Sequence, residues 1–365
     1  MMASNPRDER MRGGDPMLSR LTKLLLPLLL AALLSACPPA AETKPDPTQP
    51  APAPAIELTG HWEQDVADGL EQLVRSHGRS SAGYDPTAPP VVVFDFDNTV
   101  IRGDIGRAFF DWMALHDRFR FDAAVWQALP DDKREAIREA HQSLQQLPAA
   151  ERADSAELQR FRKRMHRAYW SLCHDTDPAQ CYPWQVRFYA GYTPDAVRAM
   201  AAEVFAAELK RPLGSEPIRA GDDDPAPAIT STGIRLHPEI LQLMELLKTH
   251  GFELWVVTAG PQWVVQGAAA HLPLEAERMI GMRTVLADGE LTTEMAEPPT
   301  FREGKVAAIE EFIGRKPLLV VGDSWTDAEM MAYGQHAVLI DRGYADLKKK
   351  AFDSGWWVQP DFPTK

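Results

Sequence analysis

The sequence predicts an α/β fold with a doubly wound, mainly parallel sheet and an inserted helical cap domain. Strand and helix patterns alternate in the last third of the chain, as in the βαβ units of a parallel sheet with helices on both faces. A run of β-branched and aromatic residues at 91–96 predicts one further buried strand. Between these parts, 107–213 shows helical patterns and almost no strand signal, so we expect a helical insertion there.

Apolar spacing and chain breakers place the elements of the last third. A helix with apolar positions Ile240, Met244 and Leu247 ends at Gly251, a residue type that favours helix termination. An Asp-Gly pair within Val285–Thr293 predicts a short hairpin. The expected elements are helices at His237–His250, Arg302–Ile313 and Thr326–Tyr333, and strands at Phe252–Thr258, Pro317–Gly322 and Ala337–Ile340.

The insertion is expected to consist of helices followed by a loop. Residues 212–232 are polar and rich in Pro, Gly and Asp, which predicts a flexible loop or hinge. The domain boundaries that follow are a core at 58–106 and 233–365 and a cap at 107–232. The cap helices are expected at Arg107–His116, Asp132–Gln145, Ala156–Ser171 and Pro194–Leu209.

The N-terminus has the pattern of a secretory signal. Basic residues at 20 and 23 precede the apolar run Leu24–Leu34, which predicts a signal peptide over 1–36, with translation starting at Met17. The following Cys37 completes a sequence that resembles the bacterial lipoprotein cleavage box, which implies a lipidated Cys37. The alternatives are a plain signal peptide and the start of a hydrophobic helix.

A Pro-rich linker is predicted at 37–57, because this segment has too few bulky apolar residues to bury a core. Pro38 supplies no aspartate retention signal of the kind known for inner-membrane lipoproteins. We therefore expect an outer-membrane lipoprotein of the bacterial cell envelope that faces the periplasm, with its lipid at Cys37 as the membrane partner.

Charge narrows the range of partners. The formal net charge of −13 argues against nucleic acid, which needs a basic face. The negative charge does not exclude small phosphorylated substrates, because one Lys and a metal ion can offset the negative electrostatic potential locally. The sequence contains no run of about twenty uninterrupted apolar residues, so we expect no ordinary membrane span.

The residues that follow the first predicted strand are the most informative about function. Asp95 and Asp97 stand two positions apart at its end and are followed by Asn98 and Thr99. Paired carboxylates at the end of a central strand suit metal binding and attack on phosphorus better than packing. The alternative is that they cap the next turn.

Three later segments place polar residues at comparable positions. Thr258 ends an apolar strand, Lys305 lies at the start of a helix, and Asp323 with Asp327 follows the apolar strand that ends in Gly322. Open α/β sheets bind their ligands at the carboxyl ends of the strands. We expect these residues to meet there.

In this order, the four segments resemble the motifs of the haloacid dehalogenase superfamily, in its phosphatase branch. Asp95 to Thr99 matches the Asp-x-Asp-x-Thr signature, and the three later segments match the remaining motifs. The resemblance implies a Rossmann-like core, and the insertion resembles the C1 helical cap of phosphoserine-phosphatase-like members. Residues 98–104 also resemble secreted bacterial phosphorylcholine phosphatases, while lipoprotein acid phosphatases or nucleotidases are the second choice.

The resemblance implies a role for each motif residue in a phosphoric monoester hydrolase. Asp95 is the expected nucleophile, which forms an aspartyl-phosphate, and Asp97 the acid and then the base. Mg²⁺ is the expected cofactor, held by Asp95, Asp323 and the backbone carbonyl of Asp97. Thr258 and Lys305 are expected to bind the phosphoryl group and Asp327 to orient Lys305, with Asn98 and Thr99 in support.

A small phosphate monoester is the expected substrate, with phosphorylcholine and phosphoethanolamine as the leading candidates. Trp325 is a candidate aromatic contact for a substrate cation, and Asp104 a candidate counter-charge. The alternatives are that the tryptophans belong to the cap core and that Asp104 caps a helix. A non-catalytic binding lipoprotein of the same fold and a phosphotransferase or mutase are the competing hypotheses of function.

Cys173 and Cys181 form an even pair in an oxidising compartment, so a disulfide is expected. Two free buried thiols are one alternative. A zinc site that adds His174 is another, although its spacing fits no common structural site.

Overall fold

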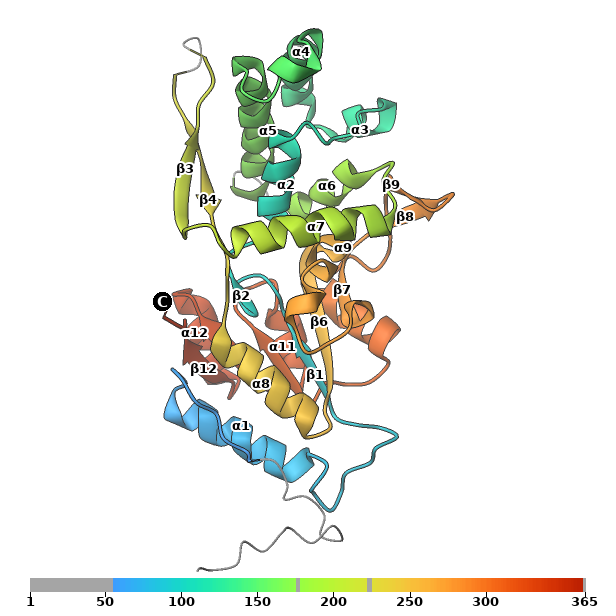
Figure 1. The fold of residues 1–365 in the computed structure, drawn as a ribbon. Coiled ribbons are helices and arrows are strands. Elements are labelled where there is room, and N and C mark those ends of the chain that lie inside the picture. The colour runs from blue at the N-terminus through green and yellow to red at the C-terminus, as the bar shows by residue number, and fades with distance from the viewer. Residues whose placement is uncertain (1–54, 175–177, 222–224, 364–365) are drawn as a thin grey trace, which may run out of the picture. The chain divides into compact units, whose positions relative to one another are not determined.

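The computed structural model describes residues 55–174, 178–221 and 225–363, which belong to one compact unit (Figure 1). The predicted signal peptide, Cys37 and nearly all of the linker lie outside the described residues. Among the residues that are described, no helix has the length and apolarity needed to cross a membrane.

A six-stranded parallel sheet forms the core, which confirms the predicted fold class. Its first strand in sequence lies in the middle, between two strands from the last third of the chain. Phe94 pairs with Val256 on one side and Val321 on the other. The central strand and the strand of Val321 therefore end at nearly the same level, while the strand of Val256 continues to Pro261. In spatial order the strands are β12 (Trp357–Pro360), β11 (His336–Asp341), β10 (Leu319–Gly322), β1 (Val91–Phe94), β6 (Glu253–Pro261) and β7 (Met279–Met282).

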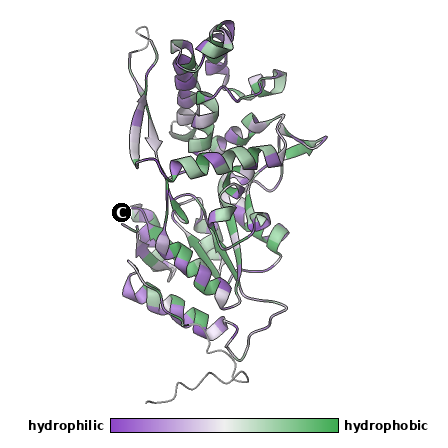
Figure 2. Cartoon of the chain, viewed as in Figure 1, coloured by the Kyte–Doolittle hydropathy of each residue, from purple (hydrophilic) through white to green (hydrophobic). Residues whose placement is uncertain are grey.

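Helices cover both faces of the sheet, and the alternation of side chains along β1 explains how. Val92 and Phe94 pack in one apolar cluster, with α1 (Gln64–His77) and α8 (Pro238–Thr249). Val91 and Val93 point to the opposite face. There they pack with residues of α10 (Glu303–Ala308), the π-helical turn Ile309–Ile313, α11 (Ala328–Tyr333) and α12 (Ala345–Asp353). The central strands are accordingly hydrophobic in Figure 2.

Most of the elements expected in the last third are present with small shifts of their ends. The predicted hairpin is β8 (Thr284–Ala287) and β9 (Glu290–Met295). Asp288 and Gly289 both have positive φ, 51° and 83°, as a two-residue turn of this kind requires. Five further elements were not predicted from the sequence, namely α1, β7, α12, β12 and the short helix α9 (Gln262–Gln266).

The segment at 107–232, called the cap below, is mainly helical. Rings from several of its helices pack together, with Phe110 in contact with Phe119, Trp184 and Phe188. The chain enters and leaves this region through β2 (Ile101–Arg102) and β5 (Arg235–Leu236), which pair antiparallel. The helices are α2 (Ile105–Leu115), α3 (Ala123–Ala128), α4 (Asp131–Gln146), α5 (Ala156–His174), α6 (Pro178–Val186) and α7 (Pro194–Glu208).

The prediction of a flexible loop at 212–232 is wrong for most of that segment. Strands β3 (Gly214–Ile218) and β4 (Ala228–Thr232) form an antiparallel hairpin. Along β4, Ala228 and Thr230 are buried and alternate with exposed Ile229. This alternation is the signal of a half-buried strand, but the Pro, Gly and Asp content of the segment hid it.

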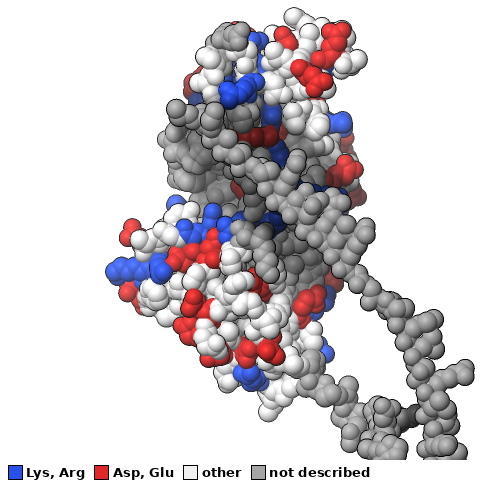
Figure 3. All heavy atoms as spheres, turned by 60° about the vertical axis from the view of Figure 1, so that its left-hand side comes forward, with Lys and Arg blue, Asp and Glu red and all other residues white. Residues whose placement is uncertain are grey.

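Acidic and basic side chains are interspersed on the face shown in Figure 3, over the part of it formed by described atoms. Several charged side chains of the described residues are paired at short range, such as Lys349 with Asp353 and Lys348 with Asp341. No continuous basic surface is visible there, in keeping with the acidic net charge.

Candidate active site

Asp95 is the first residue after β1, at the centre of the sheet. Its N–H donates to the carbonyl of Val321 at 2.9 Å, which extends the pairing with β10 by one residue. The chain then turns, because the N–H groups of Thr99 and Val100 both donate to the carbonyl of Phe96. The strand and the turn together fix the carboxylate of Asp95 at the carboxyl edge of the sheet.

Asn98 makes this turn possible. Its φ of 61° lies in the left-handed region, which Asn tolerates better than most residues. Its Oδ1 accepts from the N–H of Gly103, and its own N–H donates to the carbonyl of Gly103, both at 3.2 Å. Asn98 therefore supports the loop that carries Asp95 and Asp97.

Lys305 joins two carboxylates from different strands. Its Nζ lies 2.6 Å from Asp95 Oδ1 and 2.5 Å from Asp327 Oδ1, and its side chain is fully buried. Burial opposes the charge on Lys305, but Asp327 and Asp95 outweigh it and raise its pKa. Burial and the charge of Asp327 raise the pKa of Asp95 to about 6, with Lys305 opposing them. At neutral pH the site therefore holds a charged Lys and an ionised Asp95.

Asp327 is fixed by the turn between β10 and α11. Its Oδ2 accepts from the N–H groups of Asp323 at 3.1 Å and Ser324 at 3.0 Å. Gly322 is required beside it, since an added Cβ would lie 2.7 Å from Asp327 Cβ. Asp327 is thus rigidly placed to hold Lys305.

Asp323 lies beside Asp95 and receives two side-chain donors. Thr99 Oγ1 donates to its Oδ1 at 3.3 Å, and an Arg342 guanidinium N–H donates to its Oδ2 at 3.2 Å. Burial, followed by the charges of Asp327 and Asp95, raises the pKa of Asp323 well above its usual range. Arg342 opposes this shift and was not predicted from the sequence.

The carboxylates form a group suited to a hard cation. Oxygens of Asp95, Asp323 and Asp327 lie within 4.8 Å of one another. Carboxylate oxygens are the ligands that Mg²⁺ prefers, and a divalent cation would offset the negative charge that is gathered here. Asp327 is already bound by Lys305 and two backbone N–H groups, so Asp95 and Asp323 are the side chains that fit the role of ligands.

The carboxylate of Asp97 lies outside that group and faces the start of α2. Its Oδ1 accepts from the N–H of Ile105 at 2.8 Å. Burial, and next the charge of Asp104, raise the pKa of Asp97 well above its usual range. Gly260 leaves room on the other side, because a Cβ there would lie 3.0 Å from Asp97 Oδ2.

Thr258 lies near the end of β6, next to Asp97. Its side chain is buried, and its Oγ1 accepts from the N–H of Gly260 at 3.0 Å. The hydroxyl hydrogen is therefore free to donate to a group in the cavity that Thr258 lines. Thr258 and Asp97 approach this cavity from adjacent strand ends.

A cavity of about 130 Å³ opens over these residues. Of the predicted site residues it is lined by Asp95, Asp97, Asn98, Asp104, Thr258 and Asp323. Lys305, Asp327 and Thr99 lie behind the lining, where Lys305 contacts both Asp95 and Asp327 and Thr99 contacts Asp323. The cavity is also lined by residues that sequence reasoning missed, namely Tyr169, Tyr182, Gln185, Ala259, Gly260, Ser324, Thr326, Arg342 and Tyr344.

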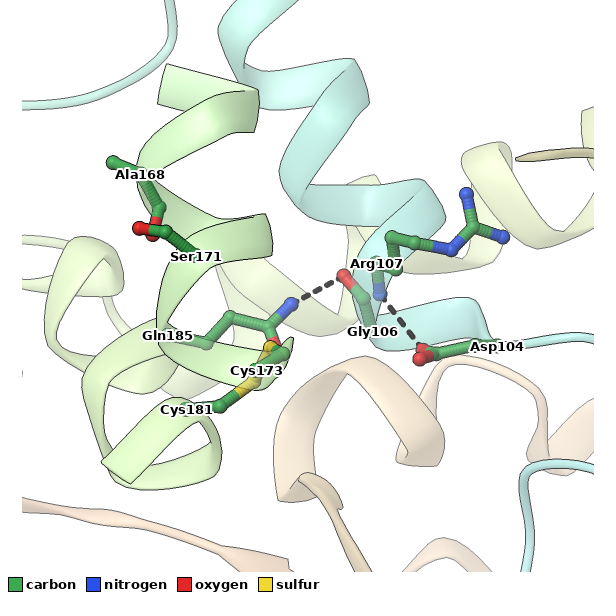
Figure 4. Close-up of a disulfide and its surroundings, with 8 residues drawn as sticks. All are labelled: Asp104, Gly106, Arg107, Ala168, Ser171, Cys173, Cys181 and Gln185. Carbon is green, nitrogen blue, oxygen red and sulfur yellow. Dashed lines mark hydrogen bonds between the residues drawn. A yellow bond between two sulfur atoms is a disulfide. The ribbon is translucent and has the colours of Figure 1, made fainter. Parts of the chain in front are cut away.

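Helices α5 and α6 of the cap form one wall of the cavity. Tyr169 belongs to α5, and Tyr182 and Gln185 to α6. The predicted disulfide is present and ties the two helices together, with a Cα–Cα distance of 4.9 Å between Cys173 and Cys181 (Figure 4).

Gln185 and Asp104 connect the cap wall to the first turn of α2. Gln185 Nε2 donates to the carbonyl of Gly106, and Asp104 Oδ1 accepts from the N–H of Arg107 at 2.8 Å (Figure 4). Asp104 is the N-cap of α2, which is the structural alternative that the sequence analysis left open. It lines the cavity as well.

The structure does not bring Trp325 to the cavity. Its side chain is 43% exposed and lies outside the cavity lining, whereas its neighbours Ser324 and Thr326 are part of that lining. The side chains on either side of Trp325 turn inward within the β10–α11 turn, and Trp325 faces solvent.

Comparisons with known proteins agree with this geometry. Residues 165–332 match the family described as haloacid dehalogenase-like hydrolase. This segment contains Thr258, Lys305, Asp323 and Asp327, and the structure adds β1, the strand that directly precedes Asp95. No curated protein matches the chain.

A solved structure of a conserved protein of unknown function from Anaerococcus prevotii shares 21% identity, with 83% of this chain and 94% of that chain covered and a TM-score of 0.73. A solved structure of a protein of unknown function from Bordetella pertussis shares 16% identity, with 74% of this chain and 98% of that chain covered and a TM-score of 0.48. At 21% identity, the similarity to the Anaerococcus prevotii structure shows a shared fold and no more. The family match and the observed sheet show that the chain contains a haloacid dehalogenase-like hydrolase domain.

Proposed function

We propose that this protein is an Mg²⁺-dependent phosphatase that hydrolyses small phosphate monoesters through an aspartyl-phosphate. The observation that carries the proposal is the placement of Asp95. Its carboxylate ends the central strand, is bound by buried Lys305 at 2.6 Å, and lines a polar cavity together with Asp97 and Thr258. This arrangement offers a nucleophile, a proton donor and phosphoryl-oxygen donors to one small substrate.

In the first step, an Asp95 oxygen attacks phosphorus and the bond from phosphorus to the ester oxygen breaks. Asp97 gives its proton to the departing oxygen, and its raised pKa favours the protonated form that this step needs. Lys305 and the Thr258 hydroxyl offset the charge of the phosphoryl oxygens. The chemistry that bound Mg²⁺ supplies is charge neutralisation between the carboxylates and the phosphate dianion.

In the second step, the Asp97 carboxylate takes a proton from water. The water oxygen forms the new bond to phosphorus, and the bond to Asp95 breaks. Inorganic phosphate leaves, and both carboxyl groups return to their starting states. Asp97 thus serves as acid and then as base from a single position.

Chelation is expected to abolish hydrolysis of p-nitrophenyl phosphate, and added Mg²⁺ is expected to restore it. Protons compete with the metal, because the pKa of Asp95 is raised to about 6. The affinity for Mg²⁺ should therefore fall as the pH is lowered through about 6. Calorimetric titration with Mg²⁺ at several pH values measures this effect. Full activity after exhaustive chelation would contradict the metal assignment.

The substrate that we propose carries a cationic leaving group, as phosphorylcholine and phosphoethanolamine do. Asp104 lines the cavity, and no salt bridge to it is found among the described residues. Tyr169 and Tyr182 add two aromatic rings to the same cavity. An unpaired carboxylate beside aromatic rings favours an ammonium group.

Asp104→Asn tests this substrate class with little disturbance, because Asn and Asp are about equally good N-caps and α2 should stay intact. We expect kcat/KM for phosphorylcholine to fall roughly tenfold relative to a neutral aliphatic phosphate of similar size. The ratio matters, because the charge of Asp104 also influences Asp97 and hence both substrates. An unchanged ratio would remove the cation site from the proposal.

We also propose that the protein is tethered to the outer membrane through a lipid on Cys37. The support is the cleavage-box sequence at 34–37 and the Pro-rich linker after it. Cys37→Ser is expected to move the protein from the membrane fraction to the soluble fraction or to block its maturation. Metabolic labelling with a fatty-acid analogue checks the attachment, and an unlabelled wild-type protein would argue against it.

A further inference from the structure

Arg342 lies in the turn that follows β11, one strand away from Asp323. The turn is braced by Asp341, whose Oδ1 accepts from the N–H of Gly343 at 2.9 Å and whose Oδ2 accepts from Lys348 Nζ at 2.7 Å. Gly343 has a φ of 90°, which the sharp bend requires. The start of the Arg342 side chain is therefore held in place.

The guanidinium of Arg342 reaches the floor of the candidate active site. It lies 3.2 Å from Asp323 Oδ2 and is 34% exposed. It is the one cationic side chain among the described residues that line the cavity. A guanidinium has five N–H donors, and within the described residues one hydrogen bond of Arg342 is found, so the remaining donors are open to the cavity and solvent.

Lys305 differs from Arg342 in its burial, its contacts and its position relative to the cavity. It is fully buried, it holds Asp95 and Asp327 together, and it does not line the cavity. Arg342 is thus the cation that a substrate can meet directly.

We infer that Arg342 is a substrate-binding residue, which holds Asp323 in the free protein and binds phosphoryl oxygens when substrate enters. The inference rests on the proposed phosphatase function. A planar guanidinium suits phosphoryl oxygens because it can donate two parallel hydrogen bonds to them.

This position gives Arg342 opposite effects on the two ligands. Its charge lies next to an expected Mg²⁺ ligand and occupies Oδ2 of Asp323, so it opposes metal binding in the absence of phosphate. Phosphate is an anion, and the same charge and donors favour its binding. A residue that merely supported the fold would affect both ligands in the same direction.

The experiment measures both binding constants on the purified protein by calorimetry. For Arg342→Gln we expect Mg²⁺, titrated without phosphate, to bind about threefold more tightly than in the wild type. Inorganic phosphate, titrated at saturating Mg²⁺, should bind about tenfold more weakly. Arg342→Lys keeps the charge and should keep the weaker Mg²⁺ binding of the wild type while losing part of the phosphate affinity.

Lys349→Gln is the matched control. It removes one positive charge from α12, which follows the turn, but Lys349 pairs with Asp353 and does not line the cavity. Both of its binding constants should stay within about twofold of the wild type, since its charge lies farther from the site and is exposed.

Opposite shifts in Arg342→Gln support the inference. Weaker binding of both ligands, or no change in either, overturns it and leaves the phosphatase proposal standing as long as the wild type binds both ligands. A wild-type protein that binds no Mg²⁺ overturns the proposed function and this inference together. The two failures are therefore distinguishable in one set of titrations.

Discussion

Asp95→Asn is expected to abolish phosphatase activity, with a loss on the order of 10⁴-fold or more. The amide keeps the shape of the side chain but cannot act as a nucleophile toward phosphorus. The protein should remain folded, because burial raises the pKa of Asp95 to about 6 and its charge at neutral pH therefore disfavours the folded state. Initial rates with p-nitrophenyl phosphate and a thermal melt measure the two effects.

The sign of the stability effect follows from the direction of this shift. A raised folded-state pKa means that the contribution of Asp95 to stability is present at low pH and is lost as the pH rises through about 6. Asn should therefore be tolerated best above that pH. Asp353→Asn, on an exposed helix end, is the control and should retain full activity. Substantial turnover by folded Asp95→Asn would refute covalent catalysis.

Lys305→Met is expected to lower the free energy of unfolding by about 3–5 kcal/mol at pH 7, besides abolishing activity. Lys305 is fully buried between Asp95 and Asp327, and Met leaves both carboxylates without their counter-charge. The loss should shrink as the pH falls, because Asp95, whose pKa burial raises, can then take up a proton. Urea denaturation followed by circular dichroism measures it.

A second substitution separates charge from packing at this position. Lys305→Met combined with Asp327→Asn removes one of the two unpaired carboxylates and should recover part of the lost stability. Asp327 is fully buried, so its uncompensated charge is the larger cost. An unchanged urea midpoint in the single variant would show that the buried ion pairs do not stabilise the fold.

The sequence revealed the parts of the site that local pattern controls. A continuous apolar run predicts the strand before Asp95, and the order of four motifs connects it with Thr258, Lys305 and Asp323. Their proximity follows from sheet topology. Asp95 and Asp323 follow neighbouring parallel strands, and Thr258 lies on β6 two residues beyond the level at which β1 ends. The roles assigned to them remain predictions.

The residues that sequence reasoning missed depend on tertiary placement. Tyr169, Tyr182 and Gln185 reach the cavity because the cap folds back over the sheet, and nothing in the local sequence distinguishes them from other cap residues. Arg342 follows an outer strand of the sheet and contacts Asp323 across a turn whose geometry the sequence pattern did not reveal. The prediction that Trp325 contacts the substrate was wrong for the same reason, since adjacency to a motif does not determine which way a side chain points.

Trapping the phosphorylated enzyme tests the account most directly. Asp97→Asn should slow the attack of water, so phosphoryl enzyme should accumulate when the leaving group is as good as p-nitrophenol. Acid quench and peptide mass spectrometry should then find one phosphoryl group, on Asp95, and none in the variant that also carries Asp95→Asn. A phosphoryl group on another residue, or none during demonstrable turnover, would contradict the assignment of Asp95 as the nucleophile.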